Sequence, residues 1–113
     1  MNSGEKGRQA EESAARFLKS HGYLILERNF RWKGGEIDII AQKNDLIIFV
    51  EVRARSSINF GTAAETVGKD KREKIRRSAL LYTQKKNLDC PLRFDIIAFD
   101  GNSMEHIENA FDF

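Results

Sequence analysis

Two apolar stretches, GEIDIIA at residues 35–41 and IIFVEVRAR at residues 47–55, decide the fold. Both are rich in β-branched residues and favour strands, over residues 36–42 and 46–55. The short connection at residues 43–45 makes the pair an antiparallel hairpin. Three acids, Glu36, Asp38 and Glu51, interrupt these apolar runs. Because burying an unpaired carboxylate is costly, their presence needs a physical reason.

The rest of the chain supplies two helices and three more strands. Apolar residues spaced three and four apart predict a helix over residues 8–20, after a flexible tail at residues 1–6. Strands are expected at residues 23–32, 92–99 and 104–110, a second helix at 69–86, and a loop with a short helical turn at 56–68. The order αβββαββ predicts an α/β fold in which helices flank a central mixed five-stranded sheet, with its first three strands antiparallel.

Bulk properties predict one soluble domain spanning residues 1–113. The chain has 41% hydrophobic and 32% charged residues and a net charge of +2, so composition alone does not identify a partner. A single cysteine, Cys90, cannot form an internal disulfide, which suits a reducing cytoplasm. No apolar run approaches the ~20 residues that cross a bilayer, and residues 1–7 lack the apolar centre of a secretory signal. We therefore expect a cytoplasmic protein without a membrane partner.

The parity of the hairpin turn determines whether the acids meet. If Lys43 and Asn44 form the turn centre, Glu36 opposes Glu51; if Asn44 and Asp45 form it, Asp38 opposes Glu51. Both even-length turns place Asp38 and Glu51 on one face, because opposed residues of an antiparallel pair point to the same side. An odd-length turn without a bulge would separate them.

Two interpretations of the converging acids remain open from the residues alone. Clustered carboxylates raise one another's pKa unless a cation neutralises them, and their oxygens suit Mg²⁺ or Mn²⁺. The lone cysteine and the separated His21 and His106 argue against zinc. The alternative is a salt-bridged surface on which the acids pair with basic neighbours, namely Arg31, Lys33, Arg53 or Arg55.

Both predicted helices carry charges that could serve a site on the sheet. On a helical wheel, Glu11 falls within the apolar face of the first helix, although an edge position reaching water is the alternative. The second helix has eight Lys or Arg against two acids over residues 69–86. These cations could contact phosphates or could simply form a solvated surface.

The spacing of these residues resembles the PD-(D/E)XK nuclease superfamily, and within it the archaeal Holliday-junction resolvases. More closely, the chain resembles the YraN family of nuclease-like proteins. The resemblance covers nearly the whole chain and is most specific at residues 35–40 and 49–55. Its other positions are Gly7, Arg8, Glu11, Ala14, Ala15, Leu18, Gly22, Tyr23, Asn29, Phe30, Arg31, Phe60, Gly61, Glu65, Arg93, Phe94, Asp95 and residues 106–111.

The resemblance implies a restriction-endonuclease-like fold and a metal-dependent endonuclease that hydrolyses DNA phosphodiesters, with branched DNA among the expected substrates. The resemblance implies that Asp38 and Glu51 hold the metal, expected to be Mg²⁺ or Mn²⁺, and that Glu11 is an accessory catalytic acid. In the resulting hypothesis, Glu36 or Glu11 completes the metal shell. A homodimer would suit a symmetric junction. The expected nucleic-acid contacts are Arg53, Arg55, Lys69, Lys71, Arg72 and Arg76.

One departure from the superfamily pattern concerns catalysis. Arg53 stands where the motif usually has lysine, and a guanidinium remains protonated and cannot act as a base. Arg53 could still bind the scissile phosphate through two hydrogen bonds. Two further hypotheses follow: a non-catalytic nucleic-acid-binding module on the same fold, and a structural adaptor whose acids are only salt-bridged.

Overall fold

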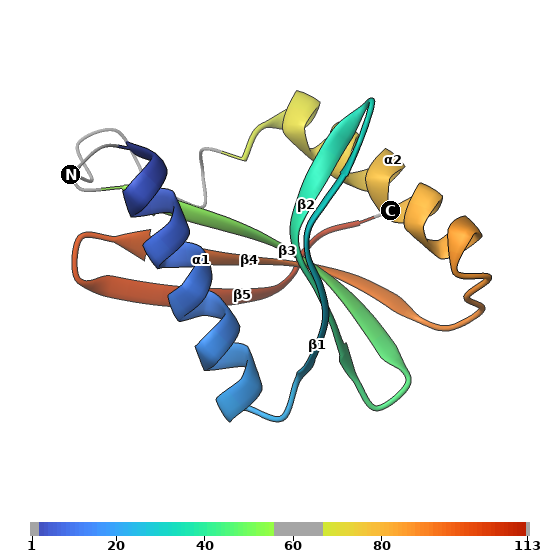
Figure 1. Cartoon of the computed structure of the whole chain (residues 1–113), viewed down its shortest axis with the longest axis horizontal. Coiled ribbons are helices and arrows are strands. Elements are labelled where there is room, and N and C mark those ends of the chain that lie inside the picture. The colour runs from blue at the N-terminus through green and yellow to red at the C-terminus, as the bar shows by residue number, and fades with distance from the viewer. Residues whose placement is uncertain (1–2, 56–66, 113) are drawn as a thin grey trace.

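The computed structural model describes residues 3–55 and 67–112, and its element order is the predicted αβββαββ (Figure 1). The elements are α1 (Ser3–Ser20), β1 (Leu24–Trp32), β2 (Gly35–Lys43), β3 (Leu46–Arg55), α2 (Lys69–Lys85), β4 (Leu92–Asp100) and β5 (Ser103–Phe111). The predicted loop at residues 56–68, with Phe60, Gly61 and Glu65, lies almost entirely outside the described residues.

The boundaries differ from the prediction mainly at the N-terminus. Helix α1 begins at Ser3, so residues 3–6, expected in a flexible tail, are helical. The helix ends where expected, because Gly22 adopts φ 88° and the Tyr23 amide donates to the Leu18 carbonyl at 3.0 Å. Strands β2 and β5 are each one residue longer at both ends than predicted, because pairing with the neighbouring strands continues at Gly35, Lys43, Ser103 and Phe111.

The sheet has the strand order β1-β2-β3-β4-β5. Strands β1, β2 and β3 pair antiparallel, β3 and β4 pair parallel, and β4 and β5 pair antiparallel. Helix α2 forms the crossover between the two parallel strands, as such a connection requires. The predicted mixed sheet is therefore confirmed.

The two helices cover opposite faces of this sheet (Figure 1). Ala14 and Leu18 of α1 are buried against a cluster that includes Ile39 and Val50. On the other face, α2 contributes Ile75, Ala79 and Tyr82 to a cluster with Ile37, Ile40, Phe49 and Phe94. The sheet thus forms the middle layer of a three-layer sandwich. No helix among the described residues is long and apolar enough to span a membrane.

The hairpin between β2 and β3 has an even-length turn. Lys43 pairs with Leu46, so Asn44 and Asp45 form the turn, and Asn44 adopts the left-handed φ of 57° that asparagine tolerates. This is the second of the two predicted registers. Continued one pair beyond Ile39 and Val50, this register would set Asp38 opposite Glu51.

Regular pairing stops next to Asp38. The hydrogen-bonded ladder between β2 and β3 ends at Ile39 and Val50, although β2 begins at Gly35 and β3 runs to Arg55. Alternation also breaks here, because Ile37 and Ile40 pack in the same cluster beneath α2 while Ile39 packs beneath α1. The start of β2 and the end of β3 therefore diverge into a fork, visible where the β1–β2 hairpin bends away from β3 (Figure 1).

Candidate active site

Asp38 lies in the fork between β2 and β3. Its Oδ2 accepts a hydrogen bond from the Val52 amide at 2.8 Å, which replaces a ladder bond that the diverging backbones cannot make. The half-buried side chain also lines a pocket of about 570 Å³ between α1 and the sheet. Asp38 is thus accessible from the pocket and held by the neighbouring strand.

Glu51 is the most deeply buried of the predicted site acids. Its side chain is 3% exposed, and the Lys71 Nζ lies 3.2 Å from Oε2. No donor in the described part of the chain reaches Oε1. Burial, a hydrogen bond with Asp38 and the charge of Asp38 raise the pKa of Glu51 to about 9, against the opposing effect of Lys71 and Arg53. At neutral pH Glu51 therefore retains its proton beside Asp38.

Glu11 points inward from α1, as the helical wheel predicts. Its side chain is 15% exposed and lines the same pocket as Asp38, and the Arg28 Nη2 lies 3.7 Å from its Oε1. Burial and the negative charge of Asp38 raise the pKa of Glu11, despite the favourable effect of Asn29 and Arg28. A third acid thus approaches Asp38 from the helix.

Two other acids near the pocket are held by arginine. Glu36 lines the pocket, but its Oε2 accepts from the Arg31 Nε at 2.9 Å, as the salt-bridge alternative expects. Glu12 is exposed, and its Oε2 accepts from the Arg28 Nη1 at 2.8 Å. These partners distinguish Glu36 and Glu12 from the poorly satisfied Glu51.

The predicted phosphate-binding cations do not gather in one place. Lys71 reaches Glu51, and the charge of Arg53 acts on the same acid, whereas the side chain of Arg55 lies outside the described residues. Arg72 donates to the Val67 carbonyl and lies over the Phe111 ring, and Arg76 bonds Glu73 and the Asp112 carbonyl. Lys69 is exposed beside these two arginines, along a separate pocket. Arg72 and Arg76 therefore serve the fold near β5.

Sequence reasoning did not identify Arg28 and Asn29 as site residues. Both line the pocket, and Asn29 adopts a left-handed φ of 55° in the middle of β1. The signal in the sequence was the polar pair Arg28-Asn29 itself, which interrupts the alternation of apolar and polar residues in β1 opposite Asp38. Asparagine within a strand is a mark of such an irregularity.

The acid pair suits a divalent cation, although it is not a preformed cage. Within residues 3–55 and 67–112, no three His, Cys, Asp or Glu side chains group closely enough to form a complete metal site. Asp38 and Glu51 nevertheless bring carboxylate oxygens together, with Glu51 Oε1 lacking a donor. Oxygen donors of this kind, supplemented by water and substrate phosphate, are the usual ligands of Mg²⁺ and Mn²⁺ in phosphate chemistry.

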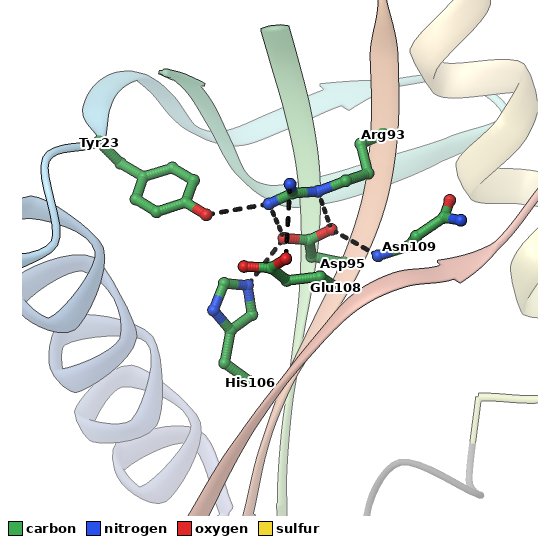
Figure 2. A network of polar contacts seen from close by, with 6 residues as sticks. All are labelled: Tyr23, Arg93, Asp95, His106, Glu108 and Asn109. Atoms are coloured by element: carbon green, nitrogen blue, oxygen red, sulfur yellow. Dashed lines mark hydrogen bonds and ion pairs between the residues drawn. The ribbon is translucent and has the colours of Figure 1, made fainter. Parts of the chain in front are cut away.

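A second buried acid, Asp95 of β4, has a contrasting environment (Figure 2). Its carboxylate is 0% exposed and accepts two bonds from Arg93, at 2.8 Å each, one from His106 Nε2 at 2.7 Å and one from the Asn109 amide at 3.0 Å. Burial would raise the pKa of Asp95, but these bonds outweigh it and lower the pKa. Tyr23 accepts a further bond from Arg93 at 2.9 Å.

Comparison with known proteins identifies a family that spans most of the chain. Residues 10–99 match the family described as "Uncharacterised protein family UPF0102". A UPF0102 protein of Sulfurihydrogenibium is 45% identical over 112 residues, covering 98% of this chain and 97% of the relative. A UPF0102 protein of Clostridioides difficile is 49% identical over 114 residues, covering 98% and 100% respectively. The chain therefore belongs to the UPF0102 family, which is the YraN family expected from its sequence.

Proposed function

We propose that this protein is a metal-dependent nuclease of the PD-(D/E)XK, restriction-endonuclease-like type, acting on DNA phosphodiesters. The carrying observation is the pair of acids in the strand fork: Asp38 lines an open pocket, and the adjacent buried Glu51 has a donor-free oxygen and a raised pKa. A fold that needed only stability would gain nothing from a buried glutamate with a donor-free oxygen. Such unsatisfied, titration-shifted acids are typical of functional sites.

The residues present suit a bound Mg²⁺ or Mn²⁺, which Asp38 and Glu51 would hold. Such an ion supplies Lewis-acid polarisation of a phosphoryl oxygen and lowers the pKa of a bound water. Glu11 faces Asp38 across the pocket and would orient water through its carboxyl group. Glu36 would join only after leaving Arg31, which makes it a secondary ligand at most.

Positive charge at the acid pair comes from two elements. Arg53 follows Glu51 by two residues on β3, and Lys71 reaches Glu51 from α2. Either would stabilise negative charge on a phosphate in the transition state. Arg53 cannot take a proton from water, because a guanidinium remains protonated. Among the described residues, Lys71 is the amine that contacts Glu51.

Arg53 also favours a second candidate function, a nucleic-acid-binding module that does not cleave. A guanidinium binds phosphate well but offers no proton-transfer chemistry. In that case the acid pair would bind a cation that bridges protein and phosphate. Cleavage separates the two functions.

The test is a cleavage assay with Mn²⁺ on branched, single-stranded and duplex DNA. The nuclease proposal expects Asp38→Asn to lower the rate at least ~100-fold, because it removes a direct cation ligand. Asp45→Asn, the same change in the exposed turn of the same hairpin, should keep full activity. Glu11→Gln should lower the rate while Glu12→Gln should not. Absence of cleavage on all three substrates would overturn the nuclease and leave the binding module.

A further inference from the structure

A second pocket lies on the other side of Glu36 and is strongly basic. It encloses about 470 Å³ and is lined by Arg31, Trp32, Lys33, Gly35, Glu36, Lys71 and Lys74. We call it the Trp32 pocket. It has four cationic side chains against one acid, and that acid is already paired with Arg31. An anionic ligand would therefore be attracted to it.

The Trp32 pocket is built on a fixed aromatic side chain. The Trp32 Nε1 donates to Ser78 Oγ at 2.5 Å, and Ser78 Oγ donates in turn to the Lys74 carbonyl at 2.7 Å. The indole covers Gly34 so closely that a Cβ there would lie 2.3 Å from the ring. At Gly35, whose φ is 158°, a Cβ would meet Ser78 Oγ at 3.1 Å. These glycines let the β1–β2 turn pack against α2 and hold the ring in place.

The Trp32 pocket is connected to the acid pair through shared residues. Lys71 lines it and also contacts Glu51 Oε2 at 3.2 Å. Glu36 lines both this pocket and the one that holds Asp38 and Glu11. A chain of phosphates lying over Lys71 would thus pass directly beside the proposed cation site.

We propose that the Trp32 pocket binds a single-stranded segment of the nucleic-acid substrate. The phosphodiester groups of the bound strand lie against the exposed Arg31, Lys33 and Lys74, and one of its bases lies against the Trp32 indole. This combination of cations with an aromatic side chain is how proteins bind single strands without reading sequence. This inference rests on the proposed function. Arg31, Lys33 and Lys74 take the place of Arg72 and Arg76, which serve the fold, as the expected phosphate contacts.

The pocket carries its own reporter, because Trp32 is the only tryptophan in the chain. The experiment titrates the full chain with oligothymidylate and, separately, with oligouridylate in EDTA, and records tryptophan fluorescence alongside oligonucleotide anisotropy. Saturable fluorescence change that parallels anisotropy and weakens with salt is expected. The two oligonucleotides distinguish DNA from RNA as the preferred source of the strand.

Two variants of α2 provide a matched comparison. Lys74→Glu should weaken binding about tenfold and flatten its salt dependence, since it reverses a charge at the phosphate path. Lys85→Glu makes the same change on the same helix, eleven residues or ~16 Å further along, and should alter affinity less than about twofold. Both lysines are exposed, so neither change disturbs the core.

The outcomes separate this inference from the proposed function. Equal effects of Lys74→Glu and Lys85→Glu, or binding without a change in Trp32 fluorescence, would overturn the Trp32 pocket while leaving the nuclease untouched. Binding through the pocket without Mn²⁺-dependent cleavage would uphold the pocket and overturn the nuclease. Failure of the wild-type protein to bind either oligonucleotide would overturn the pocket and the nucleic-acid substrate together.

Discussion

Two aspartates of one sheet lie at irregular places in the strand pairing and have contrasting surroundings. Asp38 and Asp95 each lie where a ladder is irregular, and each accepts a bond from a backbone amide fourteen residues further along the chain. A neighbouring strand carries an asparagine with left-handed φ in both cases, Asn29 at 55° and Asn109 at 53°. The amide donor differs, because it is Val52 of β3 at Asp38 and the left-handed Asn109 itself at Asp95.

The difference lies in the hydrogen-bond donors that surround each acid. Asp95 has Arg93 and His106 in direct contact, and its pKa is lowered. Asp38 lies beside Glu51 instead. The pKa of Glu51 is raised to about 9, because burial and the neighbouring Asp38 outweigh the charge of Lys71. A buried carboxylate with enough donors stabilises the fold, whereas one without them costs stability and indicates a site for a cation.

The largest expected effect is the loss of stability on removing the charge of Asp95. Asp95→Asn should lower the free energy of unfolding by about 3–5 kcal/mol, because it leaves the largely buried Arg93 with only the exposed Glu108, at 3.7 Å, as a counter-charge. Urea unfolding followed by circular dichroism measures this change. Asp89→Asn, at an exposed position, is the control and should be neutral.

If Asp95→Asn were as stable as the control, the claim that Asp95 stabilises the fold would be wrong.

The same network also predicts how stability depends on pH. The lowered pKa of Asp95 means that its stabilising contribution is complete above the unfolded value near 3.8 and is lost as the pH falls through the lower, folded value. Wild type should therefore lose this part of its stability only in strong acid.

At Glu51, removing the acid is expected to increase the free energy of unfolding rather than decrease it. In the metal-free protein, Glu51→Gln should raise the free energy of unfolding by about 1–3 kcal/mol at pH 8, because glutamine avoids the cost of a buried ionisable group. Urea unfolding in EDTA at several pH values measures the difference between the variant and wild type.

The pH dependence of stability tests the stabilising effect of Glu51→Gln a second time. Folded Glu51 holds its proton up to about pH 9 and unfolded Glu51 releases it near 4.5, so the folded state binds more protons between these values. Stability of the wild type should fall as pH rises through this window, and the advantage of Glu51→Gln should grow. A variant destabilised equally at all pH values would show that Glu51 is a structural acceptor like Asp95.

A smaller effect is expected at the two asparagines. Asn29→Ala and Asn109→Ala should each cost about 1 kcal/mol, because alanine disfavours left-handed φ, and glycine at either position should recover the loss. Thermal unfolding measures both pairs of variants.

The two glycine variants should then differ in one respect. Asn109 contributes its backbone amide to Asp95, which glycine retains. The Asn29 side chain bonds Glu11 and lowers its pKa, so Asn29→Gly should raise that pKa further, as measured by NMR titration of the carboxyl carbon. Unchanged titration of Glu11 would contradict the placement of Asn29 in the site.

Much of the fold and part of the site follow from local patterns. The β-branched runs, the helical spacing and the Asn44-Asp45 turn determine elements that the structure confirms. The even turn sets the register that ends next to Asp38 and Glu51, and the apolar face of α1 turns Glu11 inward. Each of these relations depends on residues close in sequence or on simple periodicity.

The features that escaped prediction depend on contacts between distant elements. The break in alternation at Asp38 arises from the bend of β1 and β2, which a period of two does not encode. Arg72 and Arg76 turn toward β5 because Phe111 and Asp112 lie there. The Asp95 network joins Tyr23 to Arg93, seventy residues apart, and no single segment indicates it.

The most direct test of the account is a calorimetric titration with Mn²⁺ at pH 7 in two buffers of different ionisation enthalpy. Wild type should bind saturably and release about one proton per ion, because Glu51 must lose the proton that its raised pKa retains at neutral pH. Glu51→Gln should release none, and Asp38→Asn should not bind saturably. Absence of saturable binding by wild type, or unchanged binding by Asp38→Asn, would contradict the assignment of the acid pair as a cation site.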